Sequence, residues 1–111
     1  MVKRIHLERG DIVWADFSPT KGHEQSGLRP AIIISPGKYN SLLNMVIVCP
    51  VTKISKGYFF EVPIAGLLEK SFVLVDQLRS VDSKIRIKKR TGKVSEDEIL
   101  EIMAKMALLV Q

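Results

Sequence analysis

The sequence predicts a mainly β fold with a C-terminal helix, and two patterns carry this prediction. Short apolar runs alternate with turn-forming residues along most of the chain, which is typical of an antiparallel sheet with tight connections. Residues 95–110 instead place apolar side chains at helical spacing. Because the strands follow one another closely, with little room for helices between them, a curled or barrel-like sheet is favoured over a doubly wound one.

Seven segments are predicted as strands, and clusters such as Ser18-Pro19 and Lys56-Gly57 separate them as turns. Pro50 has no N–H for a sheet ladder, so the third strand is expected to have a bulge or an exposed edge there. A short helical turn is expected around residues 38–43. The predicted strands are 11–17, 31–35, 45–51, 59–63, 72–75, 78–81 and 84–88.

The C-terminal segment has a clear helix start. Ser95 followed by Glu98 forms a capping box, and Glu96 and Asp97 put negative charge where the helix dipole favours it. An apolar stripe then follows at helical spacing: Ile99, Ile102, Met103, Met106, Leu109 and Val110. This stripe is expected to pack on the sheet, although a methionine-rich face can also bind a partner.

Size and composition indicate one folded domain spanning residues 1–111, with 46% hydrophobic and 26% charged residues. No apolar run is long enough to span a bilayer, and the N-terminal residues lack the apolar centre of a secretory signal. The single cysteine, Cys49, can form no intrachain disulfide. These features predict a cytoplasmic protein without membrane association.

The chain carries a net charge of +5, and its cations are unevenly distributed. Residues 84–93, KIRIKKRTGK, contain six cations and no anion. The first part of this segment alternates basic and apolar residues, as in a strand with one buried and one cationic face. Phosphate is the natural partner of such a face, although a solvated strand with incidental charge has the same pattern.

Residues 19–30, PTKGHEQSGLRP, are the leading candidate for a functional loop. Two apolar strand-like runs flank this glycine-containing segment, so rigid structure would hold both of its ends. It contains groups suited to proton transfer and anion binding: Lys21, His23, Glu24, Gln25 and Arg29. A solvated hairpin connection is the alternative interpretation.

The sequence gives little support for a metal or a cofactor. His6 and His23 are far apart, and no histidine or cysteine cluster has the spacing of metal ligands. No glycine-rich nucleotide-binding motif occurs either. The remaining chemistry is acid-base and electrostatic catalysis by side chains.

RNA is a substrate that such side chains can cleave, because its ribose 2′-hydroxyl can attack the neighbouring phosphodiester. The enzyme then supplies a base, a cation for the phosphate oxygens and a proton donor for the leaving group. Glu24 suits the base, Arg29 suits the cation, and Thr52 can offer a hydroxyl to the same phosphate. A simple surface ion pair between Glu24 and Arg29 is the alternative.

Several motifs resemble the MazF and PemK family of toxin endoribonucleases, in order along nearly the whole chain. They are GDIVWADFSPTKGHEQSGLRPAIIISP, CPVT, SKGYFFEV and DQLRS. The resemblance implies a small, curled SH3-like barrel of the MazF/CcdB type with a C-terminal helix, assembled as a homodimer. It also implies metal-independent cleavage of single-stranded RNA, and inhibition by a cognate MazE-like antitoxin with a flexible acidic tail.

The family's site residues fall on matching positions of this chain. The resemblance places catalysis on Arg29, Thr52 and Glu24. The PemK-like branch also gives catalytic roles to the positions of His23 and Asp76, but this chain has Leu74 where that branch has an arginine. Binding or support is therefore expected of Lys21, His23, Gln25, Asp76, Gln77 and Arg86.

Two questions remain open from the sequence. A non-enzymatic binding module, such as a CcdB-like gyrase poison or a basic RNA-binding barrel, is the alternative function. CcdB-like poisons carry a tryptophan at the end of the last helix, whereas the tryptophan of this chain is Trp14. Trp14 itself is either a core residue or an aromatic platform at the edge of a site.

Overall fold

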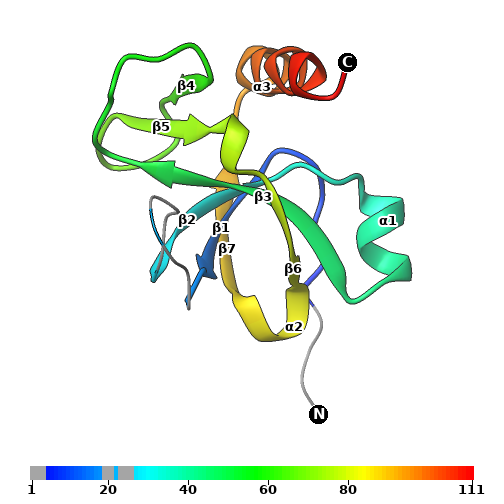
Figure 1. The fold of residues 1–111 in the computed structure, drawn as a ribbon. Coiled ribbons are helices and arrows are strands. Elements are labelled where there is room, and N and C mark those ends of the chain that lie inside the picture. The colour runs from blue at the N-terminus through cyan, green and yellow to red at the C-terminus, as the bar shows by residue number, and fades with distance from the viewer. Residues whose placement is uncertain (1–4, 19–21, 23–26) are drawn as a thin grey trace.

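A computed structural model describes residues 5–18, 22 and 27–111, which form a curled antiparallel sheet with a helix across one side (Figure 1). The predicted mainly β fold with a C-terminal helix is confirmed. In chain order the elements are β1 (Asp11–Asp16), β2 (Leu28–Ile33), α1 (Gly37–Leu42), β3 (Met45–Thr52), β4 (Glu61–Ile64), β5 (Ser71–Leu74), the 3-10 turn η1 (Val75–Gln77), β6 (Arg79–Asp82), α2 (Ser83–Arg86), β7 (Ile87–Lys93) and α3 (Glu96–Leu109).

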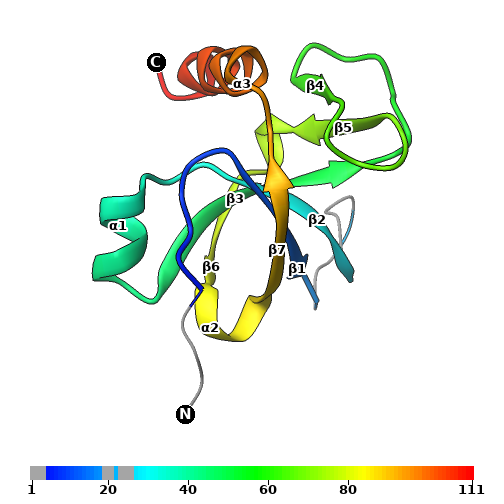
Figure 2. The same cartoon turned by 180° about the vertical axis from the view of Figure 1, so that it is seen from behind.

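The seven strands form one sheet in the order β4-β5-β3-β2-β1-β7, and β6 pairs with β3 beside this path. All the pairings are antiparallel. Among the described strands, β4 and β7 end the path, so the sheet curls without closing. Figure 2 shows β7 facing the viewer, with α2 connecting it to β6.

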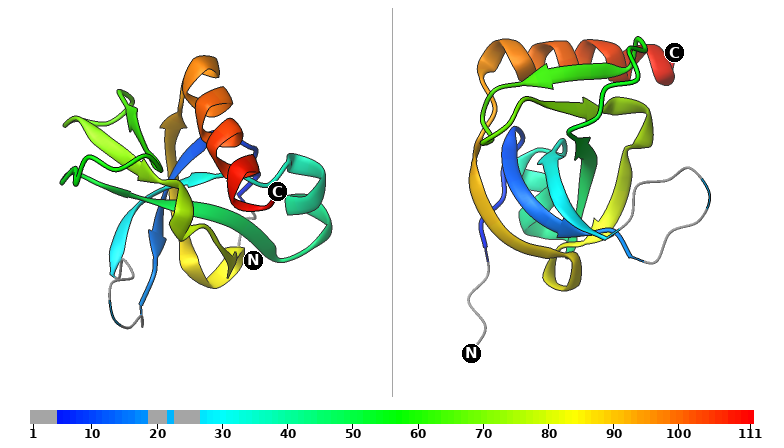
Figure 3. Two further views of the ribbon diagram at one scale, coloured as in Figure 1. Left: turned by 45° about the horizontal axis from the view of Figure 1, so that its top comes forward. Right: turned by 90° about the vertical axis from the view of Figure 1, so that its left-hand side faces the viewer.

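Two hydrophobic cores lie on opposite faces of the central strands. Alternating side chains of a strand point to opposite faces, so neighbours such as Ile12 and Val13 enter different cores. One core contains Ile102 and lies between the sheet and α3, which runs beside β4 and contacts β4 and η1 (Figure 3). The other core lies inside the curl and contains Phe17, Val48 and Val81 among its members.

Helix α3 begins with the predicted capping box. The Ser95 hydroxyl accepts a hydrogen bond from the Glu98 N–H at 3.1 Å, and the Glu98 carboxylate accepts one from the Ser95 N–H at 2.8 Å. The second Glu98 oxygen accepts from the Ala65 N–H at 2.9 Å. One carboxylate therefore caps the helix and fastens it to the connection between β4 and β5.

The expectation of a bulge or an exposed edge at Pro50 is wrong. Pro50 is buried and pairs with Ala31 of β2 without a shift in register. On the other side of β3, the partner changes from β6, which pairs with residues 45–48, to β5, which pairs with residues 51 and 52. The proline therefore lies where β3 changes partners.

The predicted strand 84–88 is also wrong, because residues 83–86 form α2 and β7 starts only at Ile87. The Asp82 side chain accepts hydrogen bonds from the N–H groups of Lys84 and Ile85, which starts a helical turn. Ile85 is 63% exposed, so the alternation of basic and apolar residues does not mark a buried face. Local capping overrides the strand-like period here.

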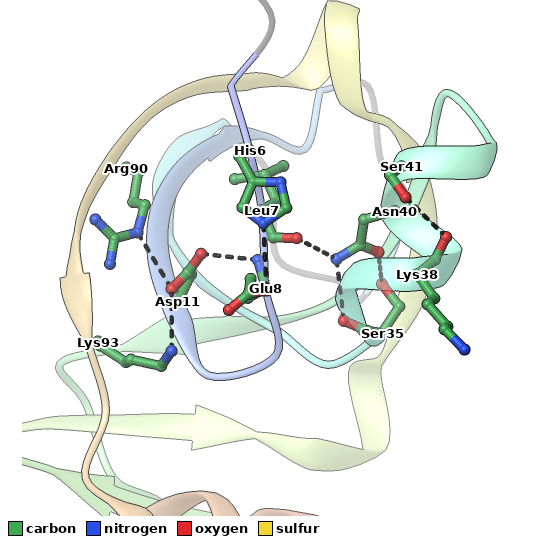
Figure 4. A network of polar contacts seen from close by, with 10 residues as sticks. All are labelled: His6, Leu7, Glu8, Asp11, Ser35, Lys38, Asn40, Ser41, Arg90 and Lys93. Carbon is green, nitrogen blue, oxygen red and sulfur yellow. Dashed lines mark hydrogen bonds and ion pairs between the residues drawn. The ribbon is translucent and has the colours of Figure 1, made fainter.

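Polar contacts fasten the N-terminal segment and β7 to the sheet (Figure 4). The buried Asn40 amide donates to the carbonyls of Leu7 and Ser35, at 2.8 and 3.1 Å. The buried Asp11 carboxylate lies 3.2 Å from Nε of Arg90, within ion-pair distance. These contacts hold both outer segments against the central strands.

The described part of the chain contains no helix of the length and apolar character needed to cross a membrane.

Candidate active site

Arg29 and Thr52 lie side by side at the ends of two neighbouring strands. The register of β2 and β3 pairs Ile33 with Val48 and Ala31 with Pro50. Continued by two residues, this register brings Arg29 opposite Thr52. Opposite residues in an antiparallel pair share one face, with Cβ atoms about 5 Å apart. The structure therefore brings together two of the three residues predicted for catalysis.

The Arg29 side chain lies against the backbone of β3. Its Nη1 atom donates to the main-chain carbonyl of Val51 at 3.4 Å, directly before Thr52. Partial burial lowers the pKa of Arg29, but a guanidinium remains charged at neutral pH. The site thus presents a held positive charge beside a hydroxyl group.

Thr52 opens a connection, residues 53–60, that is fixed by a buried carboxylate. The Thr52 hydroxyl accepts from the Ile54 N–H at 3.2 Å. Glu61, which is 7% exposed, accepts from the Ser55 hydroxyl at 2.6 Å and from the Lys56 N–H at 2.8 Å. The hydrogen bond from Ser55, more than any other contact, lowers the pKa of Glu61. Glu61 therefore stays ionised and holds the chain that follows Thr52.

The candidate loop between β1 and β2 has an ordered base. The Phe17 N–H donates to the Gly27 carbonyl at 2.9 Å, and Gly27 has φ of +80°, which glycine adopts without strain. The Asp16 carboxylate accepts from the Ser18 N–H at 2.9 Å, and this bond is the main cause of its lowered pKa. Arg86 donates to the Ser18 carbonyl. Arg86 therefore contacts the base of the loop that was predicted to carry the chemistry.

Four of the predicted site residues lie in the segments 19–21 and 23–26, outside the described residues. They are Lys21, His23, Glu24 and Gln25. Their assignment remains a prediction from the sequence.

Asp76 lies in η1 and contacts a different part of the molecule. The Tyr58 hydroxyl donates to its carboxylate at 3.2 Å. Burial first, and then the Asp76 charge, raise the pKa of Tyr58 to about 12 and that of Cys49 to about 12. Gln77 follows in the same turn. This contact links η1 to the connection before β4, which contains Tyr58.

The basic segment forms an exposed surface along α2 and β7. Lys88, Lys89 and Arg90 are all exposed, and Lys89 lies opposite the half-buried Trp14 in the sheet. Trp14 also lies opposite Pro30 of β2. Trp14 therefore lies in β1 between β2, which follows the candidate loop, and β7, which carries the exposed cations. It is half-buried at the margin of the core.

Phe72 is a neighbour of the site that sequence reasoning missed. It lies directly opposite Thr52 in the pairing of β3 with β5, and its side chain is half-buried. The sequence of the apolar run 72–75 does not indicate that its first residue is half-buried while residues 73–75 are buried in the core. Only the strand register places Phe72 beside Thr52.

The described part of the chain contains no candidate metal site. No group of three or more His, Cys, Asp or Glu side chains is arranged there so that it could hold a metal ion. The groups found at the site are a guanidinium, a hydroxyl, backbone amides and nearby cations. Such groups bind a phosphodiester and stabilise negative charge on it.

Comparison with known proteins gives consistent matches over nearly the whole chain. The family described as PemK-like, MazF-like toxin of type II toxin-antitoxin system matches residues 8–110. The endoribonuclease toxin MazF of Escherichia coli K12 is 41% identical over 110 residues, which cover 99% of each chain. A crystal structure of MazF from Deinococcus radiodurans has a TM-score of 0.86 and 36% identity, covering 96% of this chain and 98% of that one. A MazE-MazF structure from the same organism has a TM-score of 0.80 and 34% identity, with coverage of 96% and 97%.

Proposed function

This chain belongs to the PemK-like, MazF-like toxins of type II toxin-antitoxin systems and is an endoribonuclease, and we propose that it cleaves single-stranded RNA by attack of the ribose 2′-hydroxyl. The observation that carries this proposal is the guanidinium of Arg29 held beside Thr52, with Nη1 at 3.4 Å from the Val51 carbonyl. A phosphodiester placed there meets a fixed positive charge and a hydroxyl donor. No external nucleophile is then needed, because the substrate supplies its own.

In the proposed reaction, the 2′-oxygen attacks the adjacent phosphorus, and the bond from phosphorus to the 5′-oxygen breaks. Glu24 accepts the proton of the 2′-hydroxyl, and the leaving 5′-oxygen takes a proton from water. Arg29 and Thr52 stabilise the charge that develops on the phosphate oxygens. The products are a 2′,3′-cyclic phosphate and a 5′-hydroxyl, and the residues named suffice without a metal ion or cofactor.

Other residues are proposed to bind or support the RNA. Arg86 supports the loop base through the Ser18 carbonyl. Asp76 acts through its hydrogen bond with Tyr58, and Gln77 follows it in the same turn. Lys21, His23 and Gln25 belong to the proposal on the sequence alone.

The cognate partner is proposed to be a MazE-like antitoxin with a flexible acidic tail, acting with the toxin in the cytoplasm. The match to a MazE-MazF structure supports a partner of this kind. The net charge of +5 and the exposed cations of β7 favour an acidic segment as ligand.

A homodimer is also part of the proposal. The end of α1 and the C-terminal end of α3 lie on the same side of the molecule (Figures 1 and 3). Both expose apolar side chains there: Leu42 is 80% exposed, Leu108 49% and Val110 77%. Exposed apolar residues gathered on one side favour a protein contact. Sedimentation equilibrium of the wild type and of Leu108→Asp tests this: a dimer that becomes monomeric supports it, and a monomeric wild type contradicts it.

The function is tested by incubating the purified protein with a long RNA in EDTA and mapping the ends of the fragments. Cuts at a defined sequence with 2′,3′-cyclic phosphate and 5′-hydroxyl ends are expected. A single 2′-deoxy nucleotide at a mapped cut should block cleavage there, because it removes the nucleophile. Cleavage of the deoxy substrate would indicate attack by water. Binding without any cleavage would instead favour a non-enzymatic RNA-binding barrel.

A further inference from the structure

The face of the sheet that carries Arg29 and Thr52 continues onto an aromatic residue. Thr52 pairs with Phe72 of β5, and Phe72 pairs with Pro63 of β4. Together with the β2 and β3 register, this makes one cross-strand row of Arg29, Thr52, Phe72 and Pro63. Neighbours in such a row lie about 5 Å apart on the same face. Phe72 is therefore next to the proposed catalytic hydroxyl.

Phe72 is a member of neither hydrophobic core. Its strand neighbour Val73 is fully buried beneath the sheet, whereas Phe72 is half-buried and belongs to neither core cluster. Val73 pairs with Val51, which places the aromatic ring on the opposite face, with Thr52. A large aromatic side chain held on the active-site face is available to a ligand.

A cation accompanies the ring. Lys70 lies directly before β5, two residues before Phe72, with Nζ 5.8 Å from the ring centroid. An aromatic face beside a lysine is the combination that binds single-stranded nucleic acid, by base stacking and phosphate contact.

We propose that Phe72 and Lys70 form a subsite for the nucleotide next to the cleaved bond, in which the base stacks on Phe72 and Lys70 contacts the adjoining phosphate. This inference rests on the proposed function, and extends it from the catalytic pair to the adjoining part of the RNA. The occupant is a single-stranded polynucleotide because the row begins at a phosphate-binding arginine. A stacked base also gives a role to an aromatic ring that lies outside both cores.

The molecule offers a matched control for this pair. Phe59 is 58% exposed, and Lys105 Nζ lies 4.8 Å from its ring centroid, so the same two residue types meet there. Phe59 lies in the connection before β4 and outside the row. Phe59→Leu therefore makes the same chemical change as Phe72→Leu at a position outside the proposed subsite.

The test uses the full chain and two non-cleavable fluorescent probes, a (dA)20 oligonucleotide and an abasic oligonucleotide of equal length. Phe72→Leu should weaken binding of (dA)20 by about 5-fold to 100-fold, the usual effect of losing one stacked base. Binding of the abasic probe should not change, since it offers no base to stack. Phe72→Tyr should restore binding of (dA)20, and Phe59→Leu should behave as the wild type.

Lys70→Gln supplies a second readout that does not depend on the packing of Phe72. It should weaken binding of both probes and reduce the slope of log K against log salt by about 0.7, as expected for one lost phosphate contact on a single strand. In cleavage of a long RNA, Phe72→Leu should lower kcat/KM in parallel with its loss of (dA)20 affinity.

The outcomes separate this inference from the proposed function. A wild type that neither binds the probes nor cleaves RNA overturns both. If the wild type binds and cleaves, the subsite is wrong when Phe72→Leu leaves (dA)20 binding unchanged or weakens both probes equally. Weaker binding of a glutamate-rich peptide with unchanged probe binding would also overturn it, and would assign Phe72 to a protein contact.

Discussion

The guanidinium of Arg29 donates a 3.4 Å hydrogen bond to the carbonyl of Val51, the residue directly before Thr52. This contact crosses from β2 to β3 and links two positions that lie far apart in the sequence. It holds the guanidinium at the end of β3, beside Thr52. The proposed chemistry depends on this arrangement, so the first predictions concern its two side chains.

Replacing Arg29 by lysine should reduce RNA cleavage by about 100-fold or more. Lysine keeps the charge but lacks the planar guanidinium, whose N–H groups can contact a phosphate through two parallel hydrogen bonds. Initial cleavage rates measure the effect, with circular dichroism to verify folding. Arg9→Lys is the control, because Arg9 also donates to a backbone carbonyl, that of Ile34. A fully active Arg29→Lys protein would contradict the assigned role.

Thr52→Val should remove most of the activity, whereas Thr52→Ser should keep it. Valine has nearly the shape of threonine but offers no hydroxyl to the phosphate or to the Ile54 N–H. One such group contributes a factor of roughly 10² to 10³. Thr91→Val makes the same change on β7 and should cleave at the wild-type rate. Equal activity of the valine and serine variants at position 52 would exclude a role for the hydroxyl.

Tyr58 should ionise only at high pH. Its pKa is raised to about 12 by burial and by Asp76, from 10.0 in the unfolded chain. A raised pKa favours the neutral phenol, so its contribution to stability is complete below about pH 10 and is lost as pH rises through about 12. Ultraviolet difference absorbance in a Tyr39→Phe background should follow this late ionisation, and Asp76→Asn should bring it to lower pH. Ionisation near pH 10 in the parent protein would show that Asp76 does not act on the phenol.

Cys49 should resist thiol reagents while the protein is folded. Burial is the main cause of its pKa of about 12, so at pH 8 its thiolate fraction is about a thousandfold below that of a free cysteine. Reaction with a disulfide reagent should occur only when urea unfolds the chain. A Ser80→Cys variant in a Cys49→Ala background should react at once, because position 80 is exposed. Rapid labelling of native Cys49 would contradict the buried position.

Ser95→Ala should destabilise the protein by about 1 kcal/mol, the usual effect of losing a helix N-cap. Glu98→Ala should cost more, because this carboxylate accepts from both Ser95 and Ala65. Urea unfolding gives both values, and Glu96→Ala is the control on the same helical turn. If Glu96→Ala is as destabilising as Glu98→Ala, the hydrogen bonds of Glu98 to Ser95 and Ala65 do not stabilise the protein as expected.

Local signals were sufficient for much of the fold. The C-terminal helix follows from the capping box at Ser95 and from the apolar stripe, because both act between residues a few positions apart. Most of the strands follow from their apolar runs and turns. The strand predicted for residues 84–88 was wrong because Asp82, just before it, caps a helical turn. This local cap overrides the alternating pattern.

The sequence by itself determined the mainly β class, the helix at the end and, through its motifs, the family and the residues of the candidate site. The tertiary structure alone decided which of these residues meet. The register of β2, β3 and β5 brings Arg29, Thr52 and Phe72 into one row, and no local pattern encodes a register between strands far apart in the chain. Packing of two cores on opposite faces selects that register, since a slip of one residue would move every side chain of a strand to the opposite face and so into the other core.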